Sequence, residues 1–189
     1  MHLHTARIFL YEVGLYESPW VDTASRERVN ALLTCSVHLK AFFATFFKFP
    51  GEAFLVLPYS LWGQLAHALL ITSRLCLLEH QAWSDEFMDE DVRICAVLDR
   101  CKYKLEDANH FARQGWLINS GDLIIDKIQM KFTWMKRWYE EYTLSKLDQN
   151  SQLEDGKIQN KVVGGGQMEK YMLDDCRWED VIASVQLDG

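Results

Sequence analysis

An all-α fold is the fold class that this sequence predicts. Apolar residues recur at three- and four-residue spacing along most of the chain, and no useful stretch alternates polar with apolar residues. Three Pro and ten Gly in 189 residues are too few for a β-sandwich with many turns. With 49% hydrophobic and 13% aromatic residues, the chain can bury a sizeable core. We therefore expect a compact, irregular bundle of about five or six helices.

The first two predicted helices lie before residue 50. An apolar face from Leu3 to Val13 predicts a helix over 3–15, which ends at Gly14 and the following Ser18-Pro19. A second helix is predicted to begin near Thr23 and to stop at Pro50-Gly51. Its apolar residues share one face because of their spacing; they are Val29, Leu32, Leu33, Leu39, Phe42, Phe43, Phe46 and Phe47.

The third predicted helix should occupy the centre of the bundle. It opens at Pro58-Tyr59-Ser60, with Ser60 as the expected N-cap, and residues 61–78 are apolar almost all round. Residues 53–73 carry no charge, which raises the question of a membrane span. Several polar residues and Pro58 within that stretch make a lipid-facing helix unfavourable, so we predict a helix buried in a soluble domain and no membrane contact.

Two more helices and a tail follow. Ser84-Asp85-Glu86 and Ser120-Gly121-Asp122 each supply a cap and acidic first-turn residues, which predict the starts of a fourth and a fifth helix. Residues 145–170 are polar and Gly-rich, and we expect a flexible loop there. A short helix near 174–185 should dock on the core. The predicted organisation is a helical core over 1–144, the loop over 145–170 and a C-terminal helical segment over 171–189.

Charge and cysteine content narrow the function. A formal net charge of −7, with no Lys/Arg run longer than Lys136-Arg137, argues against a self-sufficient nucleic-acid binder. The five cysteines form no Cys-x-x-Cys pair, so neither a zinc knuckle nor a thioredoxin-like redox site is supported. Cysteines 35, 76 and 95 lie in apolar helical patterns, as buried free thiols do, and a reducing compartment is expected.

An acidic cluster is the first candidate for chemistry. Asp85, Glu86, Asp89, Glu90 and Asp91 could hold Mg²⁺, as the aspartate-rich helices of isoprenoid synthases do. That chemistry requires carboxylates from a facing helix, and no second acidic motif occurs. A solvated first helical turn is the favoured interpretation. We predict no catalytic residue, no metal site and no cofactor.

Polar residues inside the apolar third helix form the more informative set. Gln64, His67 and Arg74 must either pair within the protein or point at a cavity, because buried polar groups require partners. Internal pairing is the more common outcome. Together with Trp62, these residues are the candidate ligand-binding set. Five other aromatic residues are assigned to core packing: Trp20, Phe43, Phe46, Trp83 and Trp178.

The order of segments resembles the helical regulatory region of fungal binuclear zinc-cluster transcription factors, in the subset with a fungal-specific C-terminal domain. Each piece is mainly a core pattern, so the resemblance depends on their order and spacing. The segments that carry it are Leu10–Leu15, Pro19-Trp20, Arg28–Leu32, Lys40–Phe43, Phe46-Phe47, Pro50, Leu57–Leu69, Arg74-Leu75, Trp83 and Val97–Arg100, with a looser match at Cys176–Asp180.

The resemblance implies a nuclear, non-enzymatic, effector-sensing or autoinhibitory module, linked to control of metabolic or secondary-metabolite genes. Its partners would be other segments of a longer transcription factor, transcriptional proteins and a small-molecule effector. The six-cysteine zinc-cluster head of that family is absent from this sequence, so we expect no specific DNA binding by this chain. Two alternatives remain: a small helical metal-dependent enzyme acting on isoprenoid- or polyketide-like substrates, and a dimerisation or scaffold module.

Overall fold

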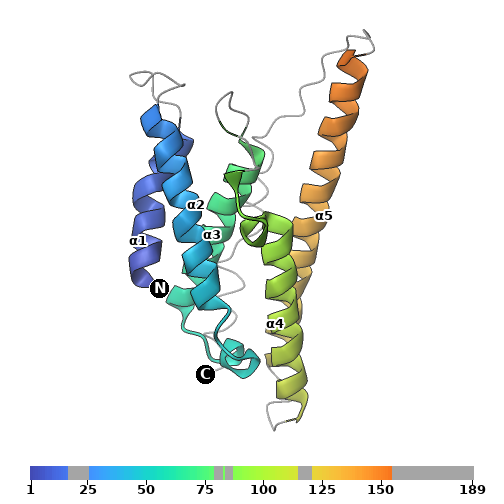
Figure 1. Cartoon of the computed structure of the whole chain (residues 1–189). Helices are drawn as coiled ribbons and strands as arrows, with labels where there is room; N and C mark the ends of the chain where they lie inside the picture. Colours follow the sequence, from blue (N-terminus) through green and yellow to red (C-terminus); the bar gives the residue numbers. More distant parts are fainter. Residues whose placement is uncertain (17–25, 79–82, 84–86, 115–120, 155–189) are drawn as a thin grey trace. The chain divides into compact units, whose positions relative to one another are not determined.

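Helices make up the computed structural model, which describes residues 1–16, 26–78, 83, 87–114 and 121–154. Within those residues no strand occurs, so the predicted all-α class is confirmed. The chain divides into two compact units, Met1–Gln114 and Gly115–Gly189, which we describe separately. Figure 1 shows the helices and their labels.

The described residues of the N-terminal unit include four α-helices and three short 3₁₀ helices. Helix α1 (His2–Tyr11) runs into η1 (Glu12–Leu15), α2 (Arg26–Phe46) is followed by η2 (Gly51–Leu55), and α3 (Tyr59–Leu77) is separated from α4 (Ile94–Gln114) by η4 (Glu90–Val92). Helices α1 and α2 lie side by side and run in opposite directions (Figure 1). The predicted helices over 3–15 and from residue 23 to Pro50 correspond to α1 with η1 and to α2.

Aromatic residues of α2 form the centre of this unit. Phe42, Phe43 and Phe46 are at most 1% exposed, and the Phe46 ring meets the Phe54 ring edge-on at a centroid distance of 5.4 Å. Edge-to-face pairs of this kind are favourable because the positive ring edge meets the negative ring face. Trp83 is 6% exposed, and its indole N–H donates to the Leu75 carbonyl over 3.0 Å. The core assignments of Phe43, Phe46 and Trp83 are confirmed, whereas Trp20 and Trp178 lie outside the described residues.

Helix α2 is also long and apolar enough, by length and composition alone, to cross a membrane. Eight of its residues are nevertheless buried, among them Leu32, Cys35, Leu39 and the three phenylalanines. A core helix passes the same test of length and composition. The burial of these residues fits a core helix.

Two predicted helix starts are corrected by the structure. Pro58, not Ser60, is the N-cap of α3, with its carbonyl accepting the Leu61 N–H over 2.9 Å. Proline suits this place because its fixed φ leads into the helix. Helix α4 begins at Ile94 instead of at 84–86, because Asp89 and Arg93 both have extended backbone (ψ 138°) that interrupts the helix.

The C-terminal unit contains helix α5 (Gly121–Glu154). Its start agrees with the predicted Ser120-Gly121-Asp122 signal, although Ser120 itself is not described. The helix continues past residue 144, so residues 145–154 of the predicted flexible loop are helical. Lys, Leu, Gln and Glu are good helix formers, which favours the continuation of the helix through this polar stretch. The rest of that loop and the predicted helix near 174–185 lie outside the described residues.

Candidate functional site: the polar face of helix α3

Three of the four candidate residues on α3 share one side of the helix. Residues 64, 67 and 74 lie within about 80° of one another at 100° per residue, whereas Trp62 lies on the opposite side. All four side chains are half-buried. The polar side of α3 faces α1 and η1, and we call the contact between them the α1–α3 interface.

Gln64 lies at the start of the α1–α3 interface. Thr5 Oγ1 donates to Gln64 Oε1 over 2.9 Å, and Gln64 Nε2 lies 3.1 Å from Nδ1 of His2. Both ends of the amide are therefore engaged by α1. Thr5 is buried, and its hydroxyl also lies 3.4 Å from the Met1 carbonyl, so the shorter bond to Gln64 is the one that links α1 to α3.

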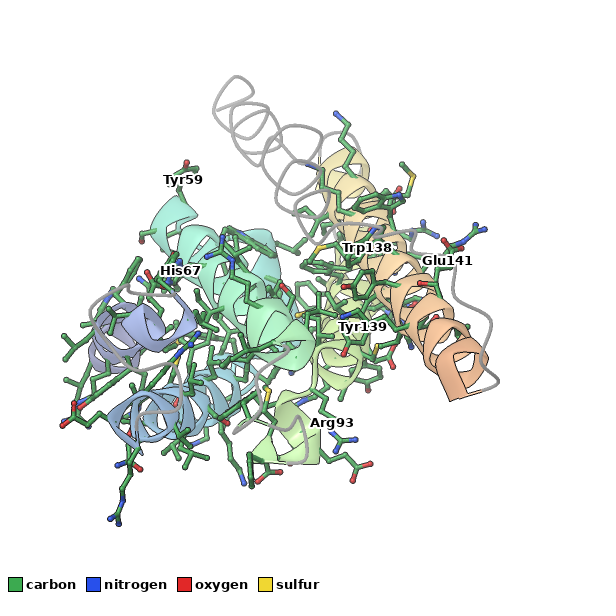
Figure 2. All side chains as sticks on the ribbon, turned by 90° about the horizontal axis from the view of Figure 1, so that it is seen from above. Tyr59, His67, Arg93, Trp138, Tyr139 and Glu141 are labelled. Atoms are coloured by element: carbon green, nitrogen blue, oxygen red, sulfur yellow. The ribbon has the colours of Figure 1, made fainter. Side chains whose placement is uncertain are left out.

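His67 is at the middle of the interface, on the side of α3 that faces α1 (Figure 2). The imidazole stacks on the Phe9 ring, with centroids 3.8 Å apart and planes inclined by 15°. Its Nε2 lies 2.9 Å from Oε2 of Glu12 in η1. Burial lowers the pKa of His67; Glu12 opposes this shift, and Arg74 adds to it. A neutral imidazole beside the carboxylate fits these surroundings.

Arg74 closes the interface at the far end of α3. A guanidinium N–H donates to the Tyr16 hydroxyl over 3.0 Å, and the guanidinium carbon lies 5.7 Å from the centre of the Tyr16 ring. Arginine commonly combines hydrogen bonding with stacking on an aromatic ring in this way. The contact ties α3 to the residue that directly follows η1.

Trp62 does not belong to this interface. Its ring meets Phe54 of η2 edge-on, at a centroid distance of 6.0 Å. The structure thus brings together Gln64, His67 and Arg74 and separates Trp62 from them. Their partners are supplied by α1, η1 and Tyr16, as expected for buried polar groups that pair within the protein.

Sequence reasoning missed the partners that α1 supplies. Thr5, Phe9 and Glu12 are spaced by four and three residues, so they lie on one side of the α1–η1 segment. The prediction had given Phe9 to a broad apolar face and had assigned no role to Thr5 or Glu12. The spacing of these three residues indicates that they share one side of the segment. It does not indicate which helix that side packs against.

A second polar contact holds α1 against α2. The rings of His4 and His38 lie 5.7 Å apart, and the Tyr11 ring lies 6.1 Å from His38. Burial lowers the pKa of His38, and the charges of Arg7 and His4 lower it further.

Arg28 of α2, which is 7% exposed, donates to the Gly14 carbonyl over 2.8 Å. Both neighbouring helices therefore hold the α1–η1 segment largely through polar groups.

The acidic cluster serves a different purpose. Asp89 forms an ion pair with Lys40 of α2, and Glu90 and Asp91 open the short helix η4. Within the described part of the chain, no group of three or more His, Cys, Asp or Glu residues is placed to hold a metal ion. Asp85 and Glu86 lie outside that part.

Comparison with known proteins shows that the chain includes a region similar to a fungal transcription factor. The relative is "Transcription factor opdL" of Penicillium oxalicum (strain 114-2 / CGMCC 5302), which is 28% identical over 106 residues. The matched region covers 55% of this chain and 18% of the relative, so it corresponds to less than a fifth of that protein. No family model matches the chain. No solved structure matches it significantly.

Proposed function

We propose that this chain is an effector-sensing or autoinhibitory region of a fungal transcriptional regulator and that it has no DNA-binding motif of its own. The similarity to a fungal transcription factor supports a regulatory role in general terms. The order of segments that resembles zinc-cluster regulators supports the more specific role, including nuclear localisation and control of metabolic or secondary-metabolite genes. Its partners would be other segments of a longer regulator or other transcriptional proteins.

The single observation that carries this proposal is how α1 is held. Only Thr5 and Ile8 of its ten residues are buried, while Leu3, Phe9 and Leu10 are at least 53% exposed. A segment with few buried apolar contacts lies at the low end of local stability and opens more readily than the core does. The contacts of Thr5 and Glu12 with α3 are polar, and water can replace them when the segment leaves.

Regulation would operate through two states of this segment. In the docked state, α1 and η1 cover Gln64, His67 and Arg74; in the released state, these side chains become available to an effector or a partner protein. A ligand that binds only the released state shifts the population toward it. Trp62, which lies on another side of α3, would remain beside Phe54 in both states.

A transcription reporter tests the autoinhibitory form of this proposal. The full chain is placed between an unrelated DNA-binding domain and an activation segment, and reporter output is compared with a fusion in which a flexible linker replaces the chain. We expect the intact chain to lower the output. His67→Ala should restore it, because it removes the contacts with Phe9 and Glu12.

The matched control is His110→Ala, on the exposed surface of α4. A chain that leaves the output unchanged would contradict autoinhibition, as would equal output from the His67→Ala and His110→Ala fusions. Circular dichroism of both variants separates loss of docking from loss of the fold. If both keep wild-type helicity, a difference in output reports on the α1–α3 interface.

A catalytic role is not proposed. The transcription-factor relative points to a non-enzyme, and Asp89, at the centre of the acidic cluster, is engaged by Lys40. Unchanged thermal stability on addition of Mg²⁺ would agree with this assignment. A rise in the melting temperature that is lost in Asp89→Ala would instead favour the metal-dependent enzyme.

One feature of α1 and η1 bears on dimerisation. Leu3, Leu10 and Val13 are 62–64% exposed, and their spacing places them on one side of α1 and η1. A ten-residue helix is only about 15 Å long, whereas a stable interface buries roughly 800 Å² per partner. The stripe is small for that purpose, so regulation is the better-supported function. A mass in sedimentation velocity that rises with concentration would reverse this preference.

A further inference from the structure

A hollow between the end of α2 and the outer side of α4 is separate from the α1–α3 interface. Its volume is about 320 Å³, and it is lined by Phe47, Asp99, Arg100, Tyr103 and Lys104. Pockets that bind small molecules commonly measure about 300–1,000 Å³. The hollow therefore has room for a small ligand, and no role has been given to these residues so far.

The lining of the hollow includes the Phe47 ring and the Arg100 guanidinium, which stacks on that ring. Phe47 is 8% exposed, and the guanidinium carbon of Arg100 lies 4.3 Å from the centre of its ring. Stacking occupies the flat face of the guanidinium and leaves the N–H groups at its edge free to donate. Tyr103, which is 67% exposed, supplies a second aromatic ring one turn along α4.

Positive charge is in excess at this place. Lys104 Nζ donates to the Phe49 carbonyl over 2.8 Å, and this acceptor carries no charge. Within the described residues, neither Arg100 nor Lys104 forms an ion pair with a carboxylate. Asp99 adds one acid to the lining. Two cations and one acid favour a ligand with a single negative charge over a polyanion.

We propose that this hollow binds a small organic monoanion, with a flat apolar ring beside Phe47 and Tyr103 and its carboxylate between Arg100 and Lys104. Aromatic rings provide the apolar contact, and the two cations provide charge-assisted hydrogen bonds. The ligand would join the end of α2 to α4, the helices that carry the lining residues. Its use as an effector rests on the proposed function, whereas its binding does not.

Isothermal titration calorimetry with 2-naphthoate and its neutral analogue 2-naphthamide tests the site on the full chain. Both probes carry the same ring, so their difference isolates the charge. We expect 2-naphthoate to bind about tenfold or more tightly than the amide, the range of one charge-assisted hydrogen bond. Arg100→Met should abolish this preference, and Asp99→Asn should tighten 2-naphthoate binding.

Arg113→Met is the matched control, since Arg113 is an exposed arginine near the end of the same helix and does not line the hollow. Equal binding of the two probes would overturn the proposal, as would equal loss in Arg100→Met and Arg113→Met. Lys104→Met is a second variant in case Arg100→Met does not fold, and it should also reduce the preference for the anion. If 2-naphthoate binds as expected but leaves the reporter unchanged, the site stands and its role as an effector site fails.

Discussion

Nε2 of His67 and Oε2 of Glu12 lie 2.9 Å apart, and within the described residues neither buried atom forms a hydrogen bond of good geometry. The two side chains are 19% and 18% exposed, so little water reaches them. This contact joins the centre of α3 to η1 and places a carboxylate against the imidazole.

Removing the Glu12 acceptor should destabilise the N-terminal unit. Glu12→Ala removes the carboxylate that lies beside the buried Nε2 of His67, and we expect the free energy of unfolding to fall by about 1–3 kcal/mol. Glu12→Gln retains an acceptor oxygen and should cost less. Urea denaturation monitored by circular dichroism measures both values. Equal losses of unfolding free energy in Glu12→Ala and Glu12→Gln would show that the contact between Glu12 and His67 contributes nothing to stability.

Acid should weaken the docking of α1. The pKa values of His38 and His67 are both lowered from about 6.5, mainly by burial. A histidine whose pKa is lowered in the folded state does not affect the free energy of unfolding at a pH above its unfolded pKa. Below that pH the unfolded state binds the proton more tightly than the folded state does, so the free energy of unfolding falls. Glu12 opposes the shift at His67, whereas Arg7 and His4 reinforce the one at His38. Stability should therefore be constant above about pH 7 and fall as the pH drops through 6.5.

Histidine variants locate this pH dependence. His38→Gln should flatten the fall in the free energy of unfolding between pH 7.5 and pH 5.5, as measured by urea denaturation at each pH. The exposed His110 of α4 provides the control, and His110→Gln should leave the profile unchanged. A profile identical in all three proteins would assign the pH dependence to other groups.

Replacing two glycines, Gly51 and Gly63, by alanine should have opposite effects on stability. A Cβ at Gly51 would overlap Oδ2 of Asp107 and would lie 2.9 Å from the Cβ of Asp107, so α4 and η2 would have to separate. Overpacking of this kind costs about 1–3 kcal/mol. A Cβ at Gly63 meets nothing within 4 Å, and alanine inside an exposed turn of α3 should stabilise by about 0.5–1 kcal/mol. Thermal melting of Gly51→Ala and Gly63→Ala, compared in one experiment, checks both signs.

The buried cysteines should react more slowly with thiol reagents than the half-buried cysteines do. Burial raises the pKa of Cys35 to about 12, and it raises the pKa of Cys101 strongly as well. Because the thiolate is the reactive form, neither should react with iodoacetamide at pH 8 in the folded protein. The half-buried Cys76 and Cys95 provide the comparison. Peptide mass spectrometry after labelling measures each site, and rapid native modification of Cys35 would contradict the packing around it.

Periodicity was sufficient for the helical class and for the position of the main helices. The phenylalanines of α2 are spaced so that Phe42, Phe43 and Phe46 share one side, and burial of that side is the dominant favourable term in folding. The predicted start of α4 was wrong, because acidic residues such as Glu90 and Asp91 also open the short helix η4. Local sequence does not show that Asp89 pairs with Lys40 of another helix.

The sequence by itself determined that Gln64, His67 and Arg74 are polar groups on an apolar helix and that they must have partners. Only the tertiary structure decided that these partners are Thr5, Glu12 and Tyr16 and that Trp62 stands apart. It also decided that Phe47 and Arg100, which are 53 residues apart in sequence, stack on one another. The physical reason is that helical periodicity defines which residues share a face, whereas the choice of the opposing face depends on how the helices pack together.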